Sequence, residues 1–481
     1  MPLFDDAMTQ GLSAPYLFVL FFKTLGFALH LIPMGIWLVG TPCSILLWLF
    51  GGMNAKRMAQ RFFQQTPILI ALGINLGIVP LLFVQLAYPK LFYTSTILVA
   101  AHWLGILPVA LFAYYACYLS SHFAKKEKLL YTAFFSAVAT LCFCAIGLVF
   151  SSVWTLFERP YEWEELWRSS AYSFSILGHE ITLGGFGSAS GLGIYWREMS
   201  IFLRFGAVAG VSFLTLATWQ VFDAFYLYRG PRVLTDEEEL RLLEMEEQGG
   251  KKVRGPIQEN PEVYPRSVTS IACAFIFLGL FIAIPTLGQY LLRTAQELSS
   301  MQGWNQVLWY ALIGTMAFSV FLALLFLLLF KIKKVSGRTL AIWMTISDLL
   351  MVGAFASLRQ WLQNLRLAPY YSPKALEDAA AVDWSAIFLF LGVFLVTLTL
   401  IIVFLRLMAT ATPKSGSAKR RRVKTKKEPK EKKSSTKKNK GEEEFTDAHL
   451  HAEQLTLGQS KRPNGGGLGS STGGKNGIRR I

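Results

Sequence analysis

The sequence of 481 residues has few charged residues, few histidines and few cysteines. Only 16% of its residues are charged, against about 25% in a typical soluble domain, and its mean hydropathy is +0.40. This balance excludes a soluble enzyme. There is no C-x-x-C-H motif for covalent haem attachment, and no C-x-x-C pair. We expect no disulfide framework, because all five cysteines lie in apolar segments, at Cys43, Cys117, Cys142, Cys144 and Cys273.

Apolar residues dominate the chain instead, at 53% of the sequence. They fall in runs of about 20 residues or more, the length that crosses a bilayer as a helix. They also lack the apolar–polar alternation of a transmembrane barrel strand. We therefore predict an all-α fold, a polytopic membrane helix bundle with about nine transmembrane helices. The predicted helices span residues 15–50, 66–88, 93–120, 129–156, 199–228, 267–292, 305–330, 338–364 and 384–409.

The distribution of lysine and arginine predicts the orientation of this bundle. Basic residues collect in the connections at 56–61, 125–128, 251–254 and 331–338, whereas the opposite connections carry less positive charge. We therefore expect the N-terminus outside and the C-terminus in the cytoplasm. The protein is predicted to be integral to a membrane, the bacterial inner membrane, with membrane lipid around it.

Polar stretches divide the chain into four predicted parts. Residues 1–228 form a five-helix bundle, 229–266 a cytoplasmic loop with an acidic helix, 267–412 a four-helix membrane bundle, and 413–481 a disordered tail. The pair Thr235 and Glu238 is typical of a capping box at the start of the acidic helix. From Lys414 onward the chain has 19 Lys/Arg and 7 Asp/Glu, a net of +12 out of a total of +16. Such a tail would be drawn to anionic lipid, and a basic run of this kind also suits nucleic acid, but we favour a solvated tail that reinforces the orientation of the bundle.

Two histidines inside predicted helices are the main candidates for chemistry, because an ionisable residue within the bilayer is expensive. His30 and His102 lie about 20 and 18 residues from the predicted inner ends of their helices, a difference of about 3 Å in depth. Two imidazoles at one height on facing helices suit the axial ligation of a b-type haem. Each histidine alone is better explained by a hydrogen bond to a neighbouring helix, and only the matched depth of the two makes haem ligation an equal alternative. Gly26 and Gly105 lie on the faces of these histidines and would let a flat ring approach.

Other intramembrane residues carry weaker predictions. Arg204, in the outer turns of its helix, is the candidate contact for haem propionates, with snorkeling to the interface as the alternative. Lys23 is expected to snorkel outward. Asp223 is expected near the inner interface. Asp348 and Arg359 suit either proton movement or structural pairing with other helices. The spacing of Gly206 and Gly210 favours close helix packing.

The stretch Phe27-Ala28-Leu29-His30 resembles the first helix of subunit I of cytochrome bd-type quinol oxidases. The chain resembles more closely a divergent branch of membrane haem b proteins associated with c-type cytochromes. Further similar stretches are Gln65 to Pro89, Thr94 to Tyr118, and Tyr195-Trp196 through Arg204 to Gly210. The resemblance covers about the first 230 residues and implies haem b or d and quinol oxidation near the outer face.

The chain departs from that family at three points, one of which is that it has no match to the family's quinol-binding loop. The family's fifth helix supplies a ligating histidine, whereas here the nearest one, His179, precedes the helix. The acidic residues of the family's third helix are missing, and His102 stands on that helix instead. Only His30 therefore carries over as a haem ligand, and oxygen reduction is not expected.

These observations leave three functional hypotheses. The first is an electron-transfer protein that passes electrons from quinol through a b-type haem to an external c-type cytochrome or a partner subunit, which would dock on the outer loop 157–198. Its candidate residues are His30 and His102 as iron ligands and Arg204 as a cofactor contact, and no catalytic residue is assigned. The alternatives are a membrane transporter or permease with a site at Asp348 or Arg359, and a structural scaffold without haem.

Overall fold

The computed structural model describes most of the membrane region and part of the outer loop. The described residues are 12, 14–169, 172–176, 179–183, 190–193, 195, 198–228, 263–297, 303–370 and 381–411. The chain divides into two units, Met1–Ala418 and Lys419–Ile481. The second unit lies outside the described residues, as do the predicted capping box at Thr235 and the basic residues 251–254.

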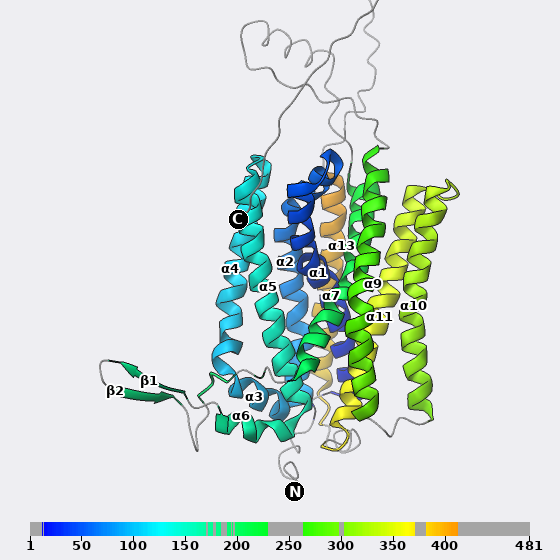
Figure 1. Ribbon diagram of the computed structural model, residues 1–481. Helices are drawn as coiled ribbons and strands as arrows, with labels where there is room; N and C mark the ends of the chain where they lie inside the picture. The colour runs from blue at the N-terminus through cyan, green and yellow to red at the C-terminus, as the bar shows by residue number, and fades with distance from the viewer. Residues whose placement is uncertain are drawn as a thin grey trace, which may run out of the picture. The chain divides into compact units, whose positions relative to one another are not determined.

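Nine helices within the described ranges are long and apolar enough to cross a membrane, which confirms the predicted all-α polytopic bundle of an integral membrane protein (Figure 1). They are α1 (Tyr16–Phe50), α2 (Met53–Ala87), α4 (Ala100–Lys125), α5 (Leu129–Glu158), α7 (Met199–Phe222), α9 (Val263–Glu297), α10 (Trp304–Lys331), α11 (Gly337–Leu367) and α13 (Trp384–Ala411). A π-helical segment, η2 (Asp223–Leu227), continues α7.

Two helix boundaries differ most from the sequence prediction. Helix α2 begins at Met53 rather than near residue 66, because the polar stretch that follows the first helix is itself helical. The predicted helix 93–120 is divided at Val99, whose φ of −118° and ψ of 30° leave the helical region. Its first part belongs to a short separate helix, α3 (Pro89–Leu98), and the membrane helix α4 starts at Ala100. Helix α1 runs on through Pro33 and Pro42.

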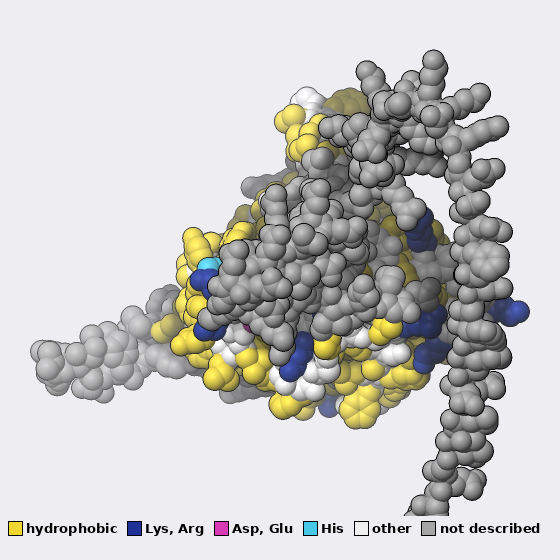
Figure 2. Space-filling view, turned by 90° about the horizontal axis from the view of Figure 1, so that it is seen from above, with side chains coloured by type: hydrophobic (Ala, Val, Ile, Leu, Met, Phe, Trp, Pro, Cys, Tyr) yellow, Lys and Arg dark blue, Asp and Glu magenta, His cyan; other side chains and the backbone are white. Residues whose placement is uncertain are grey.

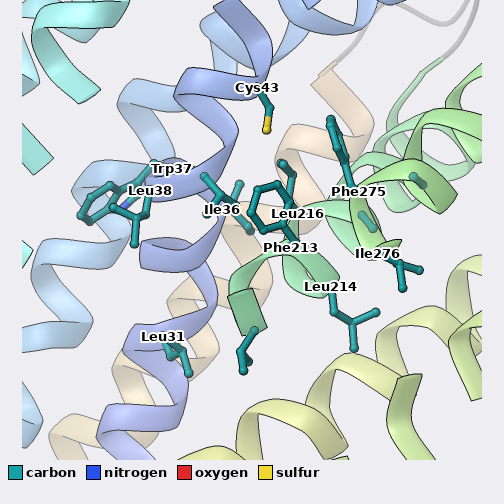
Figure 3. Close-up of a cluster of buried hydrophobic side chains, with 14 of the residues drawn as sticks. Leu31, Ile36, Trp37, Leu38, Cys43, Phe213, Leu214, Leu216, Phe275 and Ile276 are labelled. Atoms are coloured by element: carbon teal, nitrogen blue, oxygen red, sulfur yellow. The ribbon is translucent and has the colours of Figure 1, made fainter. Parts of the chain in front are cut away.

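Helix α1 lies at the centre of the packing. It packs against α2, α5, α7 and α11, while α4 packs against α2 and α5. Helices α1 and α4 therefore flank the same two neighbours. A buried apolar cluster joins α1 to α7 and α9 (Figure 3), with Ile36, Phe213 and Phe275 among its members.

Helices α7 and α9 approach each other closely at two glycines. A Cβ atom on Gly210 would lie 2.7 Å from backbone atoms of Ala283, and one on Gly206 would lie 2.6 Å from the side chain of Thr286. Only a residue without a side chain fits at Gly210, because the neighbouring backbone cannot move aside. The close packing predicted from this glycine spacing is confirmed.

The described basic connections share one end of the bundle. Lys56, Lys125, Lys126, Lys331 and Lys333 are all exposed there, and Figure 2 shows Lys and Arg side chains among apolar ones at this end. We call it the inner end, following the orientation predicted from charge. The end where α1 begins is then the outer end.

The predicted outer loop 157–198 contains regular structure. A 3-10 turn, η1 (Pro160–Glu162), leads into α6 (Trp163–Ser169), and a hairpin follows, formed by β1 (Tyr172–Ile176) and β2 (His179–Leu183). The strands are antiparallel, with Tyr172 opposite Leu183. Trp163 donates its indole N–H to the carbonyl of Leu156 at 2.9 Å, which ties the loop to the end of α5.

Candidate functional site

His30 lies in the middle of α1 and faces α2. Its Nδ1 lies 2.7 Å from the carbonyl oxygen of Gly73. Since a carbonyl oxygen only accepts, Nδ1 carries the proton and Nε2 keeps its lone pair. The ring lies directly on Gly77, where an added Cβ would lie 2.8 Å from Cε1 and Nδ1. Metal-ligating histidines commonly donate their second ring nitrogen to a carbonyl in this way.

His102 lies in the first turn of α4. Its Nδ1 is buried and has no hydrogen-bond partner within the described part of the chain. The next residue, Trp103, packs edge-on against Phe150 of α5 and Phe92 of α3, with ring centroids 5.0 Å and 5.7 Å apart. A buried imidazole nitrogen without a partner carries a desolvation penalty, and the described contacts do not offset that penalty for Nδ1 of the half-buried His102.

Two contacts fix the relative height of α1 and α5. The hydroxyl oxygens of Thr41 and Thr140 lie 3.0 Å apart. Fourteen residues further toward the outer end on each helix, Phe27 and Trp154 contact the same guanidinium group, that of Arg359, each with its ring centroid 4.1 Å from the guanidinium carbon. The two antiparallel helices therefore stay in step over this length.

This register places the two histidines at a similar height. His30 lies three residues from Phe27 on α1, and is thus level with Ser151 on α5. The residue beside it, Phe150, contacts Trp103, the neighbour of His102. His30 and His102 thus stand at similar depth, as we predicted from the sequence. They lie on α1 and α4, which both pack against α2 and α5. No direct contact joins the two side chains.

The glycines near these histidines differ from one another. A Cβ atom on Gly26 would lie 3.0 Å from Pro80, so that glycine accommodates α2 rather than a flat cofactor. A Cβ atom on Gly105, three residues after His102, would meet nothing within 4 Å. Of the two glycines predicted to admit a ring, Gly26 is covered by α2, and Gly105 has no described side chain beside it.

The donor set fits a haem better than a bare metal ion. Among the described residues there is no group of three or more His, Cys, Asp or Glu side chains able to hold a metal. A haem iron takes four of its ligands from the porphyrin and needs one or two from the protein. His30 and His102 each keep a ring nitrogen without a hydrogen-bond partner among the described residues, which is the number of ligands that a haem iron needs from the protein.

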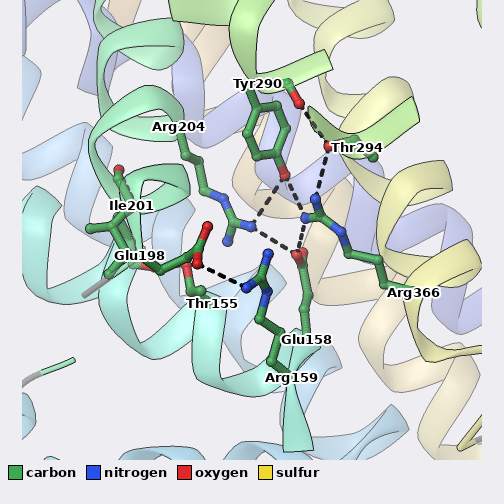
Figure 4. Close-up of polar contacts among 10 residues, drawn as sticks. Thr155, Glu158, Arg159, Glu198, Ile201, Arg204, Tyr290, Thr294 and Arg366 are labelled. Carbon is green, nitrogen blue, oxygen red and sulfur yellow. Dashed lines mark hydrogen bonds and ion pairs between the residues drawn. The ribbon is translucent and has the colours of Figure 1, made fainter. Parts of the chain in front are cut away.

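Arg204, the predicted propionate contact, belongs to an ion-pair cluster at the outer end (Figure 4). Its Nη2 donates to the Glu158 carboxylate at 2.8 Å and to the Tyr290 hydroxyl at 3.2 Å. Arg366 donates to the same carboxylate oxygen at 2.6 Å, and also to Tyr290 at 2.8 Å and Thr294 at 2.8 Å. Four helices, α5, α7, α9 and α11, therefore meet at one carboxylate. The propionate role of Arg204 stays a prediction.

A second ion pair lies beside this cluster. Arg159, which follows α5, pairs with Glu198 before α7 at 3.0 Å (Figure 4). Outside the membrane spans, burial and the nearby Glu162 carboxylate raise the pKa of the Tyr195 phenol. Tyr195 therefore stays protonated at physiological pH. These contacts close the outer end of α5 against the start of α7.

Two further cations lie near His30, of which Lys23 is buried and Arg359 is half-buried. Lys23 is 2% exposed, so the expectation that it snorkels outward is wrong. Its Nζ donates to Gln363 Oε1 at 3.3 Å and lies 4.4 Å from the ring centroid of Tyr88. Arg359 contacts Phe27 and Trp154 by their ring faces. Among described residues, neither Lys23 nor Arg359 forms an ion pair.

The two predicted acidic sites have different surroundings. Asp223 accepts two hydrogen bonds from Arg61, at 2.6 and 2.7 Å, and one from Gln65 at 2.6 Å, at the inner end of α7. Asp348 of α11 is buried and accepts one hydrogen bond, at 2.8 Å, from the Thr215 hydroxyl. Asp223 is thus placed near the inner interface, as predicted.

The five cysteines are free.

Comparison with known proteins adds no assignment. No protein-family model matches the sequence, and no curated protein is significantly similar to it. The resemblance to subunit I of cytochrome bd-type oxidases therefore stays a prediction, based on the residues around His30, and the site is interpreted from its own geometry.

Proposed function

We propose that the protein is a membrane electron-transfer protein that binds a b-type haem through His30 and His102. One observation carries the proposal. Two imidazoles stand at similar height on α1 and α4, which flank the same two helices, and neither imidazole has both ring nitrogens occupied by the described residues. One-electron transfer is the chemistry that haem supplies when bound.

The chain's own residues would orient and shield the cofactor. The Gly73 carbonyl holds the proton on Nδ1 of His30 and leaves Nε2 as the nitrogen that would bind the iron. Trp103 packs edge-on between Phe92 of α3 and Phe150 of α5 and would form an apolar wall beside the cofactor. Quinol in the outer leaflet is the proposed electron donor. The outer surface around α6 is the proposed docking face for an external c-type cytochrome or a partner subunit.

A membrane transporter is the second candidate, and the surroundings of Asp348 favour it. This carboxyl group is buried within α11, and its one described hydrogen bond comes from Thr215. An ionisable group inside a membrane helix is a typical component of a proton or ion pathway. This hypothesis requires no haem, so the absorption spectrum of the protein separates it from the first.

The test is the reduced-minus-oxidised spectrum of the purified full-length protein, with a pyridine haemochrome assay for haem content. We expect a b-type spectrum in the wild type, lost or strongly diminished in His30→Ala and in His102→Ala. His122→Ala is the matched control, because His122 is exposed near the inner end of the same helix α4. A colourless, well-folded protein would refute haem binding. A coloured protein unaffected by both substitutions would refute the ligand assignment.

A further inference from the structure

The outer half of the bundle has more positive than negative charge among its buried and half-buried side chains. Lys23, Arg204, Arg359 and Arg366 lie around one described carboxylate, that of Glu158. Arg204 and Arg366 use that carboxylate directly. Lys23 and Arg359 do not contact it, so the charges of these two cations have no ion-pair partner among the described residues.

Lys23 is buried, and its described direct contacts are with neutral groups, although Arg359 and Glu158 lie within electrostatic range of it. Its ammonium group has the Gln363 carbonyl oxygen at 3.3 Å and the face of the Tyr88 ring at 4.4 Å. Gln363 is fully buried, and its amide nitrogen has no hydrogen-bond partner in the described ranges. The Gln363 amide nitrogen and the Lys23 ammonium thus lie close together, and no described carboxylate accepts a hydrogen bond from either of them.

Arg359 is the second cation without an ion pair within the described ranges. Its guanidinium lies against the faces of Phe27 and Trp154. It is also within electrostatic range of Glu158, Arg204 and His30. Cation–π contacts stabilise a guanidinium but leave its five N–H donors to find acceptors elsewhere. Arg204 has the same need, because its Nη1 is buried and without a partner among the described residues.

Buried charge of this kind requires a counterion. Removing an ion from water costs several kcal/mol even after relaxation, and the described chain offers no second carboxylate beside Lys23 or Arg359. The guanidinium fork binds carboxylate and phosphate oxygens in pairs. We propose that Lys23, Arg359 and Arg204 form a binding site for the oxyanion of a membrane-embedded ligand, a carboxylate or a phosphate.

Two sources of this oxyanion are consistent with the geometry. The first is the pair of propionate carboxylates of the haem, and this alternative rests on the proposed function. Lys23 lies two helical turns outward from His30 on the same face of α1, about 10 Å along the axis. The second is the phosphate of an anionic lipid from the outer leaflet, which requires no haem.

The experiment compares full-length wild type with Arg359→Gln, Arg359→Lys and Lys23→Gln, purified from membranes in mild detergent. Haem content is measured by pyridine haemochrome, and tightly bound phospholipid by extraction and mass spectrometry. Lys331→Gln is the control, since Lys331 is exposed at the inner end. We expect Arg359→Gln and Lys23→Gln to weaken binding about 10-fold or more. Arg359→Lys, which keeps the charge and loses the fork, should fall between them and the wild type.

The pattern of loss identifies the source. Loss of haem with unchanged lipid indicates propionates, and loss of a bound anionic lipid indicates a phosphate. A colourless wild type that loses its anionic lipid in the variants would support the oxyanion site while refuting the haem function. If the folded variants, Arg359→Lys among them, retain wild-type haem and lipid, the proposal is overturned.

Discussion

Replacing Glu158 by glutamine should destabilise the protein more than replacing either of its arginine partners. Glu158 is 4% exposed and accepts hydrogen bonds from Arg204 at 2.8 Å and Arg366 at 2.6 Å. Glutamine keeps the shape and one acceptor oxygen but removes the negative charge. The variant therefore leaves two buried guanidinium groups facing each other without a carboxylate between them.

The magnitude follows from the charge separation. At about 4 Å and an effective dielectric constant of about 20, each ion pair is worth about 4 kcal/mol before desolvation. Breaking a buried pair from one side costs about 3–5 kcal/mol, and we expect Glu158→Gln to fall in that range. Arg204→Gln removes one attraction but also the repulsion between Arg204 and the other cations. Its cost should be less than half as large.

The assay is equilibrium unfolding in mixed micelles with increasing sodium dodecyl sulfate, followed by tryptophan fluorescence. Glu164→Gln is the control, because Glu164 and Arg168 form an exposed ion pair, with side chains 75% and 63% exposed, which is worth about 0.5 kcal/mol or less. Equal losses for Glu158→Gln and Arg204→Gln, or a larger loss for Arg204→Gln, would refute the view that positive charge is in excess in this cluster.

Two other substitutions test close backbone contacts. Gly77→Ala would place a Cβ atom 2.8 Å from the His30 ring, so it should displace the imidazole and lower haem content, and an unchanged spectrum would argue against His30 as a ligand in this position. Gly210→Ala would clash with the backbone of Ala283 and should destabilise the bundle by about 1–3 kcal/mol. The control is Gly314→Ala, because a Cβ atom there would meet nothing within 4 Å. It should be neutral or stabilising by up to about 1 kcal/mol. Equal effects of Gly210→Ala and Gly314→Ala on stability would contradict the packing of α7 on α9.

The features that sequence predicts here are those encoded locally. Runs of apolar residues predicted the nine helices of the described ranges, and the spacing of Gly206 and Gly210 predicted the tight packing of α7. The break at Val99 was not predicted, because the apolar pattern continues through it and only the backbone angles reveal the turn.

The polar cluster could not be predicted in the same way. Glu158 and Arg366 are 208 residues apart, and no local pattern indicates that their helices meet. Sequence placed Glu158 in a loop, since it follows the last apolar residue of its predicted helix. Lys23 was expected at the interface because long cationic side chains usually snorkel, but the packing of α11 against α1 encloses it.

The most direct test of the account is the electron paramagnetic resonance spectrum of the oxidised, purified protein. Ligation of one haem iron by His30 and His102 predicts a low-spin ferric signal that either alanine substitution converts to high spin or abolishes, while His122→Ala leaves it intact. A wild-type protein without a ferric haem signal, or with one that both substitutions leave unchanged, would contradict the central claim.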